Sequence, residues 1–431
     1  MSTTVSQTVT IPPENVAGGG KATEYWSRYL TSVLTRLFSS VGGYTPSEQQ
    51  AQIEFMQKHV APIVGPVPAE PYGLFNMPYI PAPLEASVNL TTKGKPKARI
   101  WMNLGKPLDQ SRFEPNAAER DSEALLSIAR ASGADTRWLE CLTKAMFLTP
   151  SQLEAVRARG GPAWPFSLFC FDFTGMDRTM RAYFPAVPRG GRSRTEVGLD
   201  AIKSLKPFGP NLEAGLNLVQ SALTRDLEYS YLDDNKYKAG IHMLGVDCLD
   251  PEQARVKIYI DVNSNSWNAA SDVMTLGGRL TDATSLKAVE LLQSVYHLMR
   301  DEPEGVDDDW SKPSAVPDRS FPGQQFSVEI TAKSSIPEMK IYVPLVQYAG
   351  DTQKAEENMH RMLQKLGHEW ASNGKLKETM TAVSASESIR GLGVVTFSYS
   401  EKKGSYSSVY FAPPPDYADK VVIESRGLSV V

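Results

Sequence analysis

Four short segments of the chain repeat one order of side chains: a cation, then an apolar residue, then an aromatic residue. They are Arg99-Ile100-Trp101, Arg181-Ala182-Tyr183, Lys257-Ile258-Tyr259 and Lys340-Ile341-Tyr342. The cations of successive segments lie about 80 residues apart. Lysine and arginine bind anionic groups such as phosphates, and aromatic faces attract cationic ligands. The repeated order therefore indicates an anion site with aromatic walls.

Each of these segments has the pattern of a β-strand. In the stretch from Arg255 to Asp261, alternation places Arg255, Lys257 and Tyr259 on one face and apolar residues on the other. A strand unit that recurs at a near-regular interval favours a closed, quasi-symmetric sheet. If the sheet closes into a barrel, the cations and aromatic rings line its interior and the apolar faces pack against outer helices.

Pairs of predicted strands alternate with predicted helices along the chain. The expected strand pairs are 84–90 with 99–102, 166–173 with 181–184, 240–246 with 255–262, 325–330 with 339–343, and 392–399 with 406–411. Helical periodicity covers residues 21–60, 116–159, 196–222, 285–299 and 352–371. The count predicts an α+β fold of about ten antiparallel strands with helices outside.

No clean linker divides the chain, so we expect one domain over residues 21–431, with a two-domain α+β arrangement as the alternative. Residues 1–20 are rich in Ser and Thr and end in three glycines, which predicts a disordered tail. They lack the basic and apolar regions of a signal peptide. No apolar run approaches the ~18–20 residues that cross a bilayer.

The composition is that of a soluble globular protein, with 431 residues, 41% hydrophobic and 22% charged. A net charge of −4 supplies no basic field for nucleic acid. The three cysteines are dispersed, which is typical of a reducing, cytoplasmic protein. The five histidines show no paired ligand spacing, so a zinc site is not expected.

The order of motifs resembles the fungal dimethylallyltryptophan-synthase-type indole prenyltransferases, over most of the chain from about Tyr25 to Pro413. The resemblance is carried by Pro83-Leu84-Glu85-Ala86-Ser87-Val88-Asn89, Arg99, Arg181-Ala182-Tyr183, Arg255-Val256-Lys257-Ile258-Tyr259, Lys340-Ile341-Tyr342-Val343-Pro344, Tyr406 and Tyr410. It implies a ten-stranded antiparallel β-barrel ringed by α-helices, the ABBA prenyltransferase barrel. It also implies transfer of a dimethylallyl group from its diphosphate to an indole by electrophilic aromatic substitution.

The resemblance assigns three groups of site residues. Glu85 is implied as the catalytic carboxylate that holds the indole N–H. The implied diphosphate-binding residues are Arg99, Arg181, Arg255, Lys257 and Lys340. The implied tyrosines that shield the allyl cation are Tyr183, Tyr259, Tyr342, Tyr406 and Tyr410. Family members often carry Lys at the position of Arg181 and can carry Gln at that of Lys340, and both departures keep or add positive charge.

No metal cofactor is expected. Isoprenoid enzymes of the helical kind bind magnesium diphosphate through DDxxD, and neither Asp233-Asp234 nor the run Asp307-Asp308-Asp309 has the third carboxylate at that interval. Five basic side chains can replace the charge of the metal. The acidic run at 307–309 is interpreted as a solvated loop.

The resemblance also bears on the acceptor. Family members that prenylate free tryptophan at C4 resemble one another in carrying a Lys, a Tyr and an Arg where this chain has Leu168, Pro185 and, by an approximate count, His242. A zwitterion therefore lacks its partners, which favours a tryptophan-containing cyclic dipeptide or another tryptophan-derived alkaloid. The protein is expected to be a monomer or homodimer that binds neither nucleic acid nor membrane.

Other functions stay open at this point. The acceptor could be free tryptophan or a non-indole aromatic compound. The same cavity could also serve a non-catalytic binder of a phosphorylated aromatic ligand, but a pure anion binder gains nothing from Glu85. A nucleic-acid platform is disfavoured by the net charge, and a phosphatase by the lack of a nucleophile or metal set.

Overall fold

The computed structural model describes residues 20–65, 67, 84–104, 116–158, 167–208, 211–225, 240–262, 264–315, 323–372, 374–384 and 392–413. The tail expected over residues 1–20 lies outside these residues except for Gly20, which begins the first helix. Pro83, Phe166 and the Asp233-Asp234 pair also lie outside them.

Ten antiparallel strands form one closed barrel, in which each strand pairs with its neighbours in sequence and the first pairs with the last. The strands are β1 (Leu84–Thr91), β2 (Lys97–Asn103), β3 (Leu168–Thr174), β4 (Asp177–Pro185), β5 (Gly240–Asp247), β6 (Arg255–Val262), β7 (Gln324–Thr331), β8 (Ser334–Val343), β9 (Leu392–Ser400) and β10 (Gly404–Phe411). The five strand pairs expected from the sequence are confirmed as ladders of the barrel. The expected closed barrel of ten antiparallel strands is therefore confirmed.

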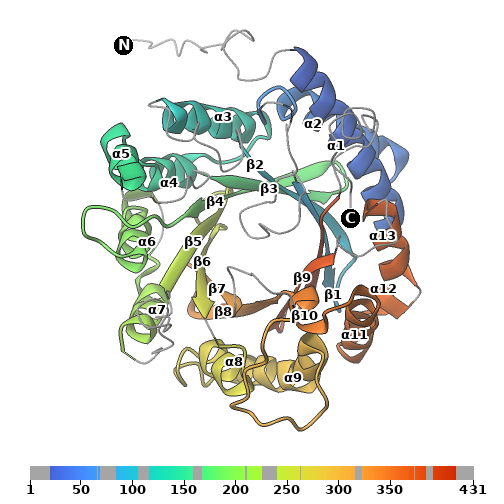
Figure 1. Cartoon of the computed structure of the whole chain (residues 1–431). Helices are drawn as coiled ribbons and strands as arrows, with labels where there is room; N and C mark the ends of the chain where they lie inside the picture. Colours follow the sequence, from blue (N-terminus) through green and yellow to red (C-terminus); the bar gives the residue numbers. More distant parts are fainter. Residues whose placement is uncertain are drawn as a thin grey trace.

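Helices surround the barrel on the outside, as the view along its axis shows (Figure 1). They are α1 (Gly20–Val41), α2 (Pro46–His59), α3 (Ala117–Ala131), α4 (Arg137–Met146), α5 (Pro150–Ala158), α6 (Arg194–Lys203), α7 (Glu213–Arg225), α8 (Trp267–Met274), α9 (Ala283–Arg300), α10 (Leu345–Ala349), α11 (Thr352–Lys365), α12 (Glu369–Ser372) and α13 (Lys375–Ser384). No helix among the described residues has the length and apolar character needed to cross a membrane.

One helix expected from the sequence is divided in the structure. The periodicity over residues 352–371 predicts a single helix, but α11 ends at Lys365 and α12 begins at Glu369. Gly367 between them has a φ of 81°, a left-handed conformation that a glycine adopts without steric cost. The prediction of one continuous helix was wrong because a glycine can end a helix whose apolar spacing continues.

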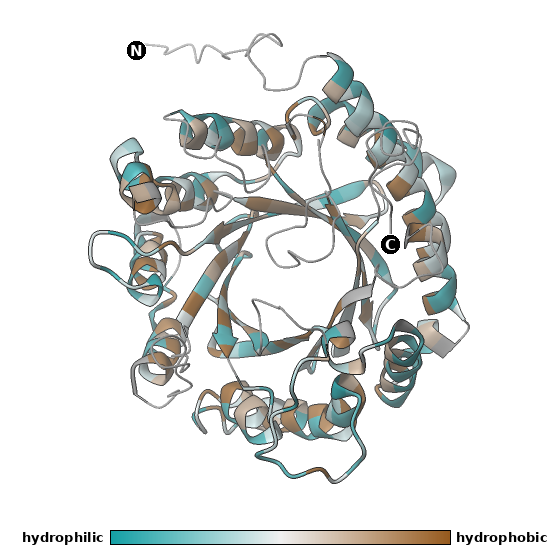
Figure 2. Cartoon of the chain, viewed as in Figure 1, coloured by the Kyte–Doolittle hydropathy of each residue, from teal (hydrophilic) through white to brown (hydrophobic). Residues whose placement is uncertain are grey.

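The two faces of the barrel wall contribute to two separate cores. Val256, Ile258 and Ile260 face outward and join the large core between the strands and the helices. A smaller cluster fills part of the lumen and contains Trp101, Leu168, Cys170, Tyr183, Met243, Tyr259, Tyr342 and Tyr410. The alternation of polar and apolar residues along the strands is visible in Figure 2. The sheet thus buries both faces, and its inner face is the polar and aromatic one.

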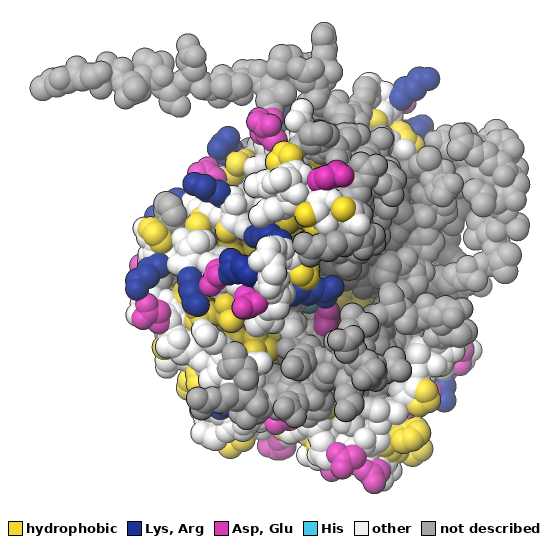
Figure 3. All heavy atoms as spheres, turned by 60° about the vertical axis from the view of Figure 1, so that its left-hand side comes forward, with side chains coloured by type: hydrophobic (Ala, Val, Ile, Leu, Met, Phe, Trp, Pro, Cys, Tyr) yellow, Lys and Arg dark blue, Asp and Glu magenta, His cyan; other side chains and the backbone are white. Residues whose placement is uncertain are grey.

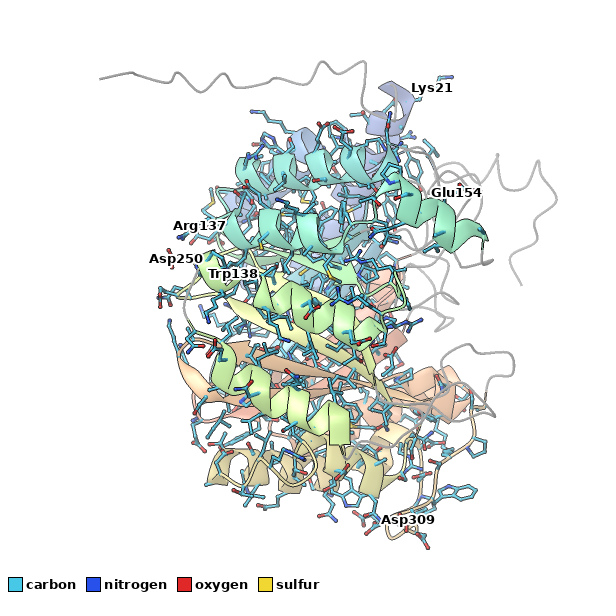
Figure 4. All side chains as sticks on the ribbon, turned by 90° about the vertical axis from the view of Figure 1, so that its left-hand side faces the viewer. Lys21, Arg137, Trp138, Glu154, Asp250 and Asp309 are labelled. Atoms are coloured by element: carbon cyan, nitrogen blue, oxygen red, sulfur yellow. The ribbon has the colours of Figure 1, made fainter. Side chains whose placement is uncertain are left out.

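The connections fix the two ends of the barrel. Because β1–β2, β3–β4, β5–β6, β7–β8 and β9–β10 are sequential antiparallel pairs, their turns all lie at one end. Nη2 of Arg137, at the start of α4, donates to Oδ2 of Asp250 in the β5–β6 turn over 2.8 Å. These two labelled residues lie together at one edge of Figure 4. We call this the turn end and the opposite one the open end.

Candidate active site in the barrel lumen

Five cations predicted as a diphosphate site come together in the lumen, towards the turn end. They project from β2, β4, β6 and β8 and are Arg99, Arg181, Arg255, Lys257 and Lys340. Four of them are at most 7% exposed, and the Arg255 side chain is 22% exposed. Burial of so many charges requires partners close by.

Three carboxylates on the intervening strands are those partners, and no pattern in the sequence predicted them. Asp172 lies on β3, Asp247 on β5 and Glu329 on β7. Each is the direct cross-strand neighbour of a cation. The pairs are Arg99 with Asp172, Arg181 with Asp247, and Lys257 with Glu329.

The carboxylates link the arginines into a chain of ion pairs. Arg181 places Nη2 at 2.5 Å from Oδ2 of Asp172 and Nε at 2.6 Å from Oδ1 of Asp247. Arg255 places Nε at 2.7 Å from Oδ2 of Asp247 and Nη1 at 2.6 Å from Oε2 of Glu329. Each of these two arginines thus connects the strand before its own with the strand after it.

The chain continues at both ends. Nζ of Lys257 and Nζ of Lys340 lie at 3.1 and 3.4 Å from Oε1 of Glu329. At the other end, Arg99 forms an ion pair with Asp172. With all these groups ionised, five cations and three carboxylates leave an excess of positive charge in the lumen.

The electrostatics favour the ionised carboxylates. Burial alone would raise the pKa of Asp172 and of Asp247, but the neighbouring arginines outweigh it and hold both well below the ordinary range. Burial lowers the pKa of Lys257 well below its ordinary value, and Glu329 opposes that shift. Nη1 of Arg181 is buried without a partner among the described residues. An arriving anion would pair with this N–H group and stabilise the charged form of Lys257.

Four of the five predicted shielding tyrosines form the aromatic cluster of the lumen: Tyr183, Tyr259, Tyr342 and Tyr410. The rings of Tyr183 and Tyr259 meet edge to face, with centroids 5.9 Å apart. The Tyr342 hydroxyl donates to that of Tyr259 over 3.3 Å. Burial holds the pKa of these phenols well above 10, so they are neutral.

Trp101 belongs to the same cluster, although it was not among the predicted shielding residues and was noted only for its place in the repeated segments. Its ring stacks on Tyr183 with centroids 4.0 Å apart and 27° between the planes. The signal was available, because Trp101 occupies the same place after Arg99 as Tyr183 does after Arg181.

The fifth predicted tyrosine, Tyr406, lies among the cations and not in the cluster. Nζ of Lys340 is 4.2 Å from the centre of its ring. With the Asn89 amide oriented to satisfy all its contacts, the nitrogen donates to the Tyr406 hydroxyl over 3.0 Å and the oxygen accepts from Nε of Arg99 over 3.2 Å. Burial would raise the pKa of Tyr406, but Lys340 and Arg99 bring it below 10. Its hydroxyl is thus placed beside the anion site.

Glu85, the predicted catalytic carboxylate, stands apart from the ion-pair chain. It is 4% exposed on the lumen face of β1 and lies directly opposite Trp101 on β2. No hydrogen bond or ion pair joins its carboxyl group to another described residue. Burial raises its pKa to about 8, and the charge of Arg99 partly offsets this. A buried carboxyl group that has no partner among the described residues can accept a hydrogen bond from a ligand.

The residues used to infer the acceptor occupy three different settings. Leu168 packs in the aromatic cluster, and Pro185 ends β4. His242 is engaged, with Nδ1 2.8 Å from Oδ2 of Asp261. None of the three adds a charge that is free to hold an amino-acid backbone.

The described residues contain no cluster that could hold a metal ion, and charges of both signs mix on the face that Figure 3 shows. No group of three or more His, Cys, Asp or Glu side chains there is placed to hold a metal ion. Asp307, Asp308 and Asp309 are exposed, as expected of a solvated loop. On the face that Figure 3 shows, Lys and Arg side chains are interspersed with Asp and Glu side chains.

Comparisons with known proteins show which sequences and structures this chain is similar to. The sequence model of the family described as tryptophan dimethylallyltransferase matches residues 22–378. The chain is 38% identical over 410 residues to the indole prenyltransferase tdiB of Emericella nidulans, which covers 91% of this chain and 96% of that protein. It is 30% identical over 441 residues to the indole diterpene prenyltransferase terF of Tolypocladium album. That match covers 95% of this chain and 98% of terF.

The fold is also found among solved structures. The crystal structure of NotF in complex with brevianamide F and DMSPP superposes with a TM-score of 0.72 at 19% sequence identity. The match covers 93% of this chain and 96% of NotF. At that identity the likeness supports the barrel fold alone.

Proposed function

This chain belongs to the tryptophan dimethylallyltransferase family of prenyltransferases, and we propose that it transfers a dimethylallyl group from its diphosphate to the indole of a tryptophan-derived acceptor. The observation that carries the proposal is the division of the lumen. A chain of cations at the turn end adjoins an aromatic cluster. The carboxyl group of Glu85, which pairs with no other described residue, faces that cluster.

The cations act on the leaving group. When the carbon–oxygen bond of the donor breaks, the electron pair leaves with the diphosphate and negative charge grows on its oxygens. Arg99, Arg181 and Lys257 are already held in place by their carboxylates, so they stabilise that charge without reorganising. Arg255 and Lys340 extend the same field.

The aromatic cluster acts on the allyl cation. The faces of Tyr183, Tyr259, Tyr342 and Tyr410 offer electron density to a delocalised cation. Their burial keeps water from adding to it. Because the phenols are neutral, none of them competes as an anionic nucleophile.

Glu85 acts on the acceptor. In its ionised form the carboxylate accepts the indole N–H and makes the ring carbon more nucleophilic. The ring then attacks the allyl cation, and loss of a proton from the attacked carbon restores aromaticity. Metal is not needed in this scheme, because the five side-chain cations supply the charge that a metal ion would otherwise supply.

The preferred acceptor in this proposal is a neutral compound such as a tryptophan-containing cyclic dipeptide. Leu168, Pro185 and the engaged His242 offer no free charge to an ammonium or carboxylate group. Because the chain is similar to terF, an indole diterpene prenyltransferase, the proposed class of acceptors also includes larger neutral indoles.

The test is a comparison of tryptophan and cyclic dipeptides at equal concentrations of dimethylallyl diphosphate, with product masses and proton spectra. Faster prenylation of the cyclic dipeptides supports the proposal. Faster turnover of tryptophan with a C4-prenylated product would overturn the acceptor class, and no transfer to any indole would overturn the whole function.

A further inference from the structure

Two buried polar atoms near Glu85 have no hydrogen-bond partner among the described residues. They are Oδ1 of Asn103 and Nε1 of Trp101. The two residues are 5% and 3% exposed. A buried polar group left without a partner destabilises the folded state, because it has lost its hydrogen bonds to water and gained none in the protein. A ligand in the lumen that forms hydrogen bonds with these atoms would explain why no described residue pairs with them.

The strand geometry places both residues around the same part of the lumen. Arg99, Trp101 and Asn103 occupy every second position of β2, so their side chains share its inner face. Trp101 lies directly opposite Glu85 on β1, and Asn103 directly opposite Leu168 on β3. Arg99 is the member nearest the turn end, and Asn103 is the last residue of β2 towards the open end. Asn103 therefore lies on the acceptor side of the aromatic cluster, away from the cations.

The three groups differ in what they require of a ligand. The Glu85 carboxylate and the Asn103 carboxamide oxygen accept hydrogen bonds, whereas the Trp101 indole N–H donates one. An indole with no other polar group satisfies Glu85 and leaves the other two atoms unpaired. Both remaining atoms are uncharged, so they fit a neutral polar group better than an ammonium or a carboxylate.

We propose that Asn103 and Trp101 are acceptor-recognition residues. Oδ1 of Asn103 accepts from a second N–H or O–H group of the acceptor, and the Trp101 N–H donates to its carbonyl or hydroxyl oxygen. A secondary amide carries both groups, so an indole bearing such an amide is the substrate class that completes the site. This inference rests on the proposed function and adds the part of the acceptor beyond its indole ring.

The test compares two acceptors, a tryptophan-containing cyclic dipeptide and 3-methylindole, in the variants Asn103→Leu and Trp101→Phe. The first variant removes the carboxamide at similar size, and the second keeps an aromatic ring for Tyr183 while removing the N–H. We expect each variant to lower the ratio of kcat/KM for the cyclic dipeptide to that for 3-methylindole by about tenfold or more. If Asn103→Leu does not fold, Asn103→Ser replaces it.

Ser407→Ala is the matched control. The Ser407 hydroxyl is also buried without a partner among the described residues, but it lies between Tyr406 and Ser408 on β10 and so faces outward. We expect this variant to keep the acceptor ratio within about twofold. An unchanged ratio in both lumen variants, or equal losses with both acceptors, would show that the two residues only support the fold.

Calorimetric titration separates this inference from the proposed function. The full chain is saturated with inorganic diphosphate and titrated with each acceptor, so that no turnover is needed. Weaker binding of the cyclic dipeptide to the two lumen variants supports acceptor recognition even if the chain transfers no prenyl group. Equal binding to wild type and variants overturns it even if the chain is an active prenyltransferase.

Discussion

Arg181 and Asp247 are direct cross-strand neighbours on β4 and β5, and Nε of the arginine lies 2.6 Å from Oδ1 of the carboxylate. Asp247 also binds Arg255, so one carboxylate holds two cations in place. The cations of the lumen are therefore fixed before any anion arrives. The carboxylates reduce the repulsion between the cations but do not cancel all of the positive charge.

Replacement of Asp247 by Asn should destabilise the protein, and inorganic diphosphate should restore part of the loss. The change leaves the buried Arg181 and the partly buried Arg255 without their shared anion, and breaking a buried ion pair costs about 3–5 kcal/mol. Diphosphate supplies the missing negative charge and binds only the folded state. The measurement is the denaturant midpoint with and without diphosphate.

Asp250→Asn is the control for that experiment. Asp250 pairs with Arg137 on the surface, where both side chains are at least half exposed. We expect a small change in the midpoint and the same response to diphosphate as in wild type. If Asp247→Asn gained no more from diphosphate than this control does, Asp247 would not belong to the anion site.

Lys257→Ala should lower kcat by about 10²–10³ and raise the KM for dimethylallyl diphosphate, because it removes one fixed charge from the leaving-group site. The affinity for the acceptor should change little, since Lys257 contacts Glu329 and not the Glu85 side of the lumen. Steady-state kinetics with each substrate varied in turn provide the test. A collapse of acceptor affinity with normal use of the donor would reverse our assignment of the two halves.

The pH dependence should report Glu85. Its pKa is raised to about 8, so the carboxyl group is mostly protonated at pH 6 and mostly ionised at pH 9. Only the ionised form accepts the indole N–H, and kcat/KM for the acceptor should therefore rise through this range, with its midpoint near pH 8, and level off above about pH 9. The profile is measured with both wild type and Glu85→Gln.

Glu85→Gln should lose about 10²–10⁴ in rate and lose the rise with pH. Binding of the donor and the thermal transition should stay close to those of wild type, because no hydrogen bond or ion pair joins Glu85 to another described residue. Near-normal turnover with the same pH profile would mean that Glu85 is only a residue of the strand.

The repeated cation–apolar–aromatic order predicted the barrel, because strand alternation converts that order directly into an inner face. It could not predict Asp172, Asp247 and Glu329 as partners of the cations. Their registers join strands of different hairpins, such as β2 and β3, and no turn between them fixes which residues lie opposite. Each carboxylate alone looks like an ordinary polar residue of a strand.

Tyr406 shows the same limit within one strand. Its spacing from Tyr410 correctly predicts a shared face, but the face extends from the aromatic cluster to the cations. Which of the two settings a tyrosine enters depends on its height along the barrel. That height follows from the stagger of all ten strands, which a local pattern does not contain.

Turnover should persist in excess chelator, because the lumen itself carries the positive charge that the diphosphate needs. The chain of ion pairs leaves an excess of cationic charge, and Nη1 of Arg181 is still unpaired among the described residues. Diphosphate can therefore be bound and its growing charge stabilised by side chains alone. The measurement is the initial rate with dimethylallyl diphosphate and an indole acceptor after dialysis against EDTA, compared with the same sample after magnesium is restored. Similar rates in both samples are expected, whereas abolition by EDTA and recovery with magnesium would show that the side-chain cations are not sufficient.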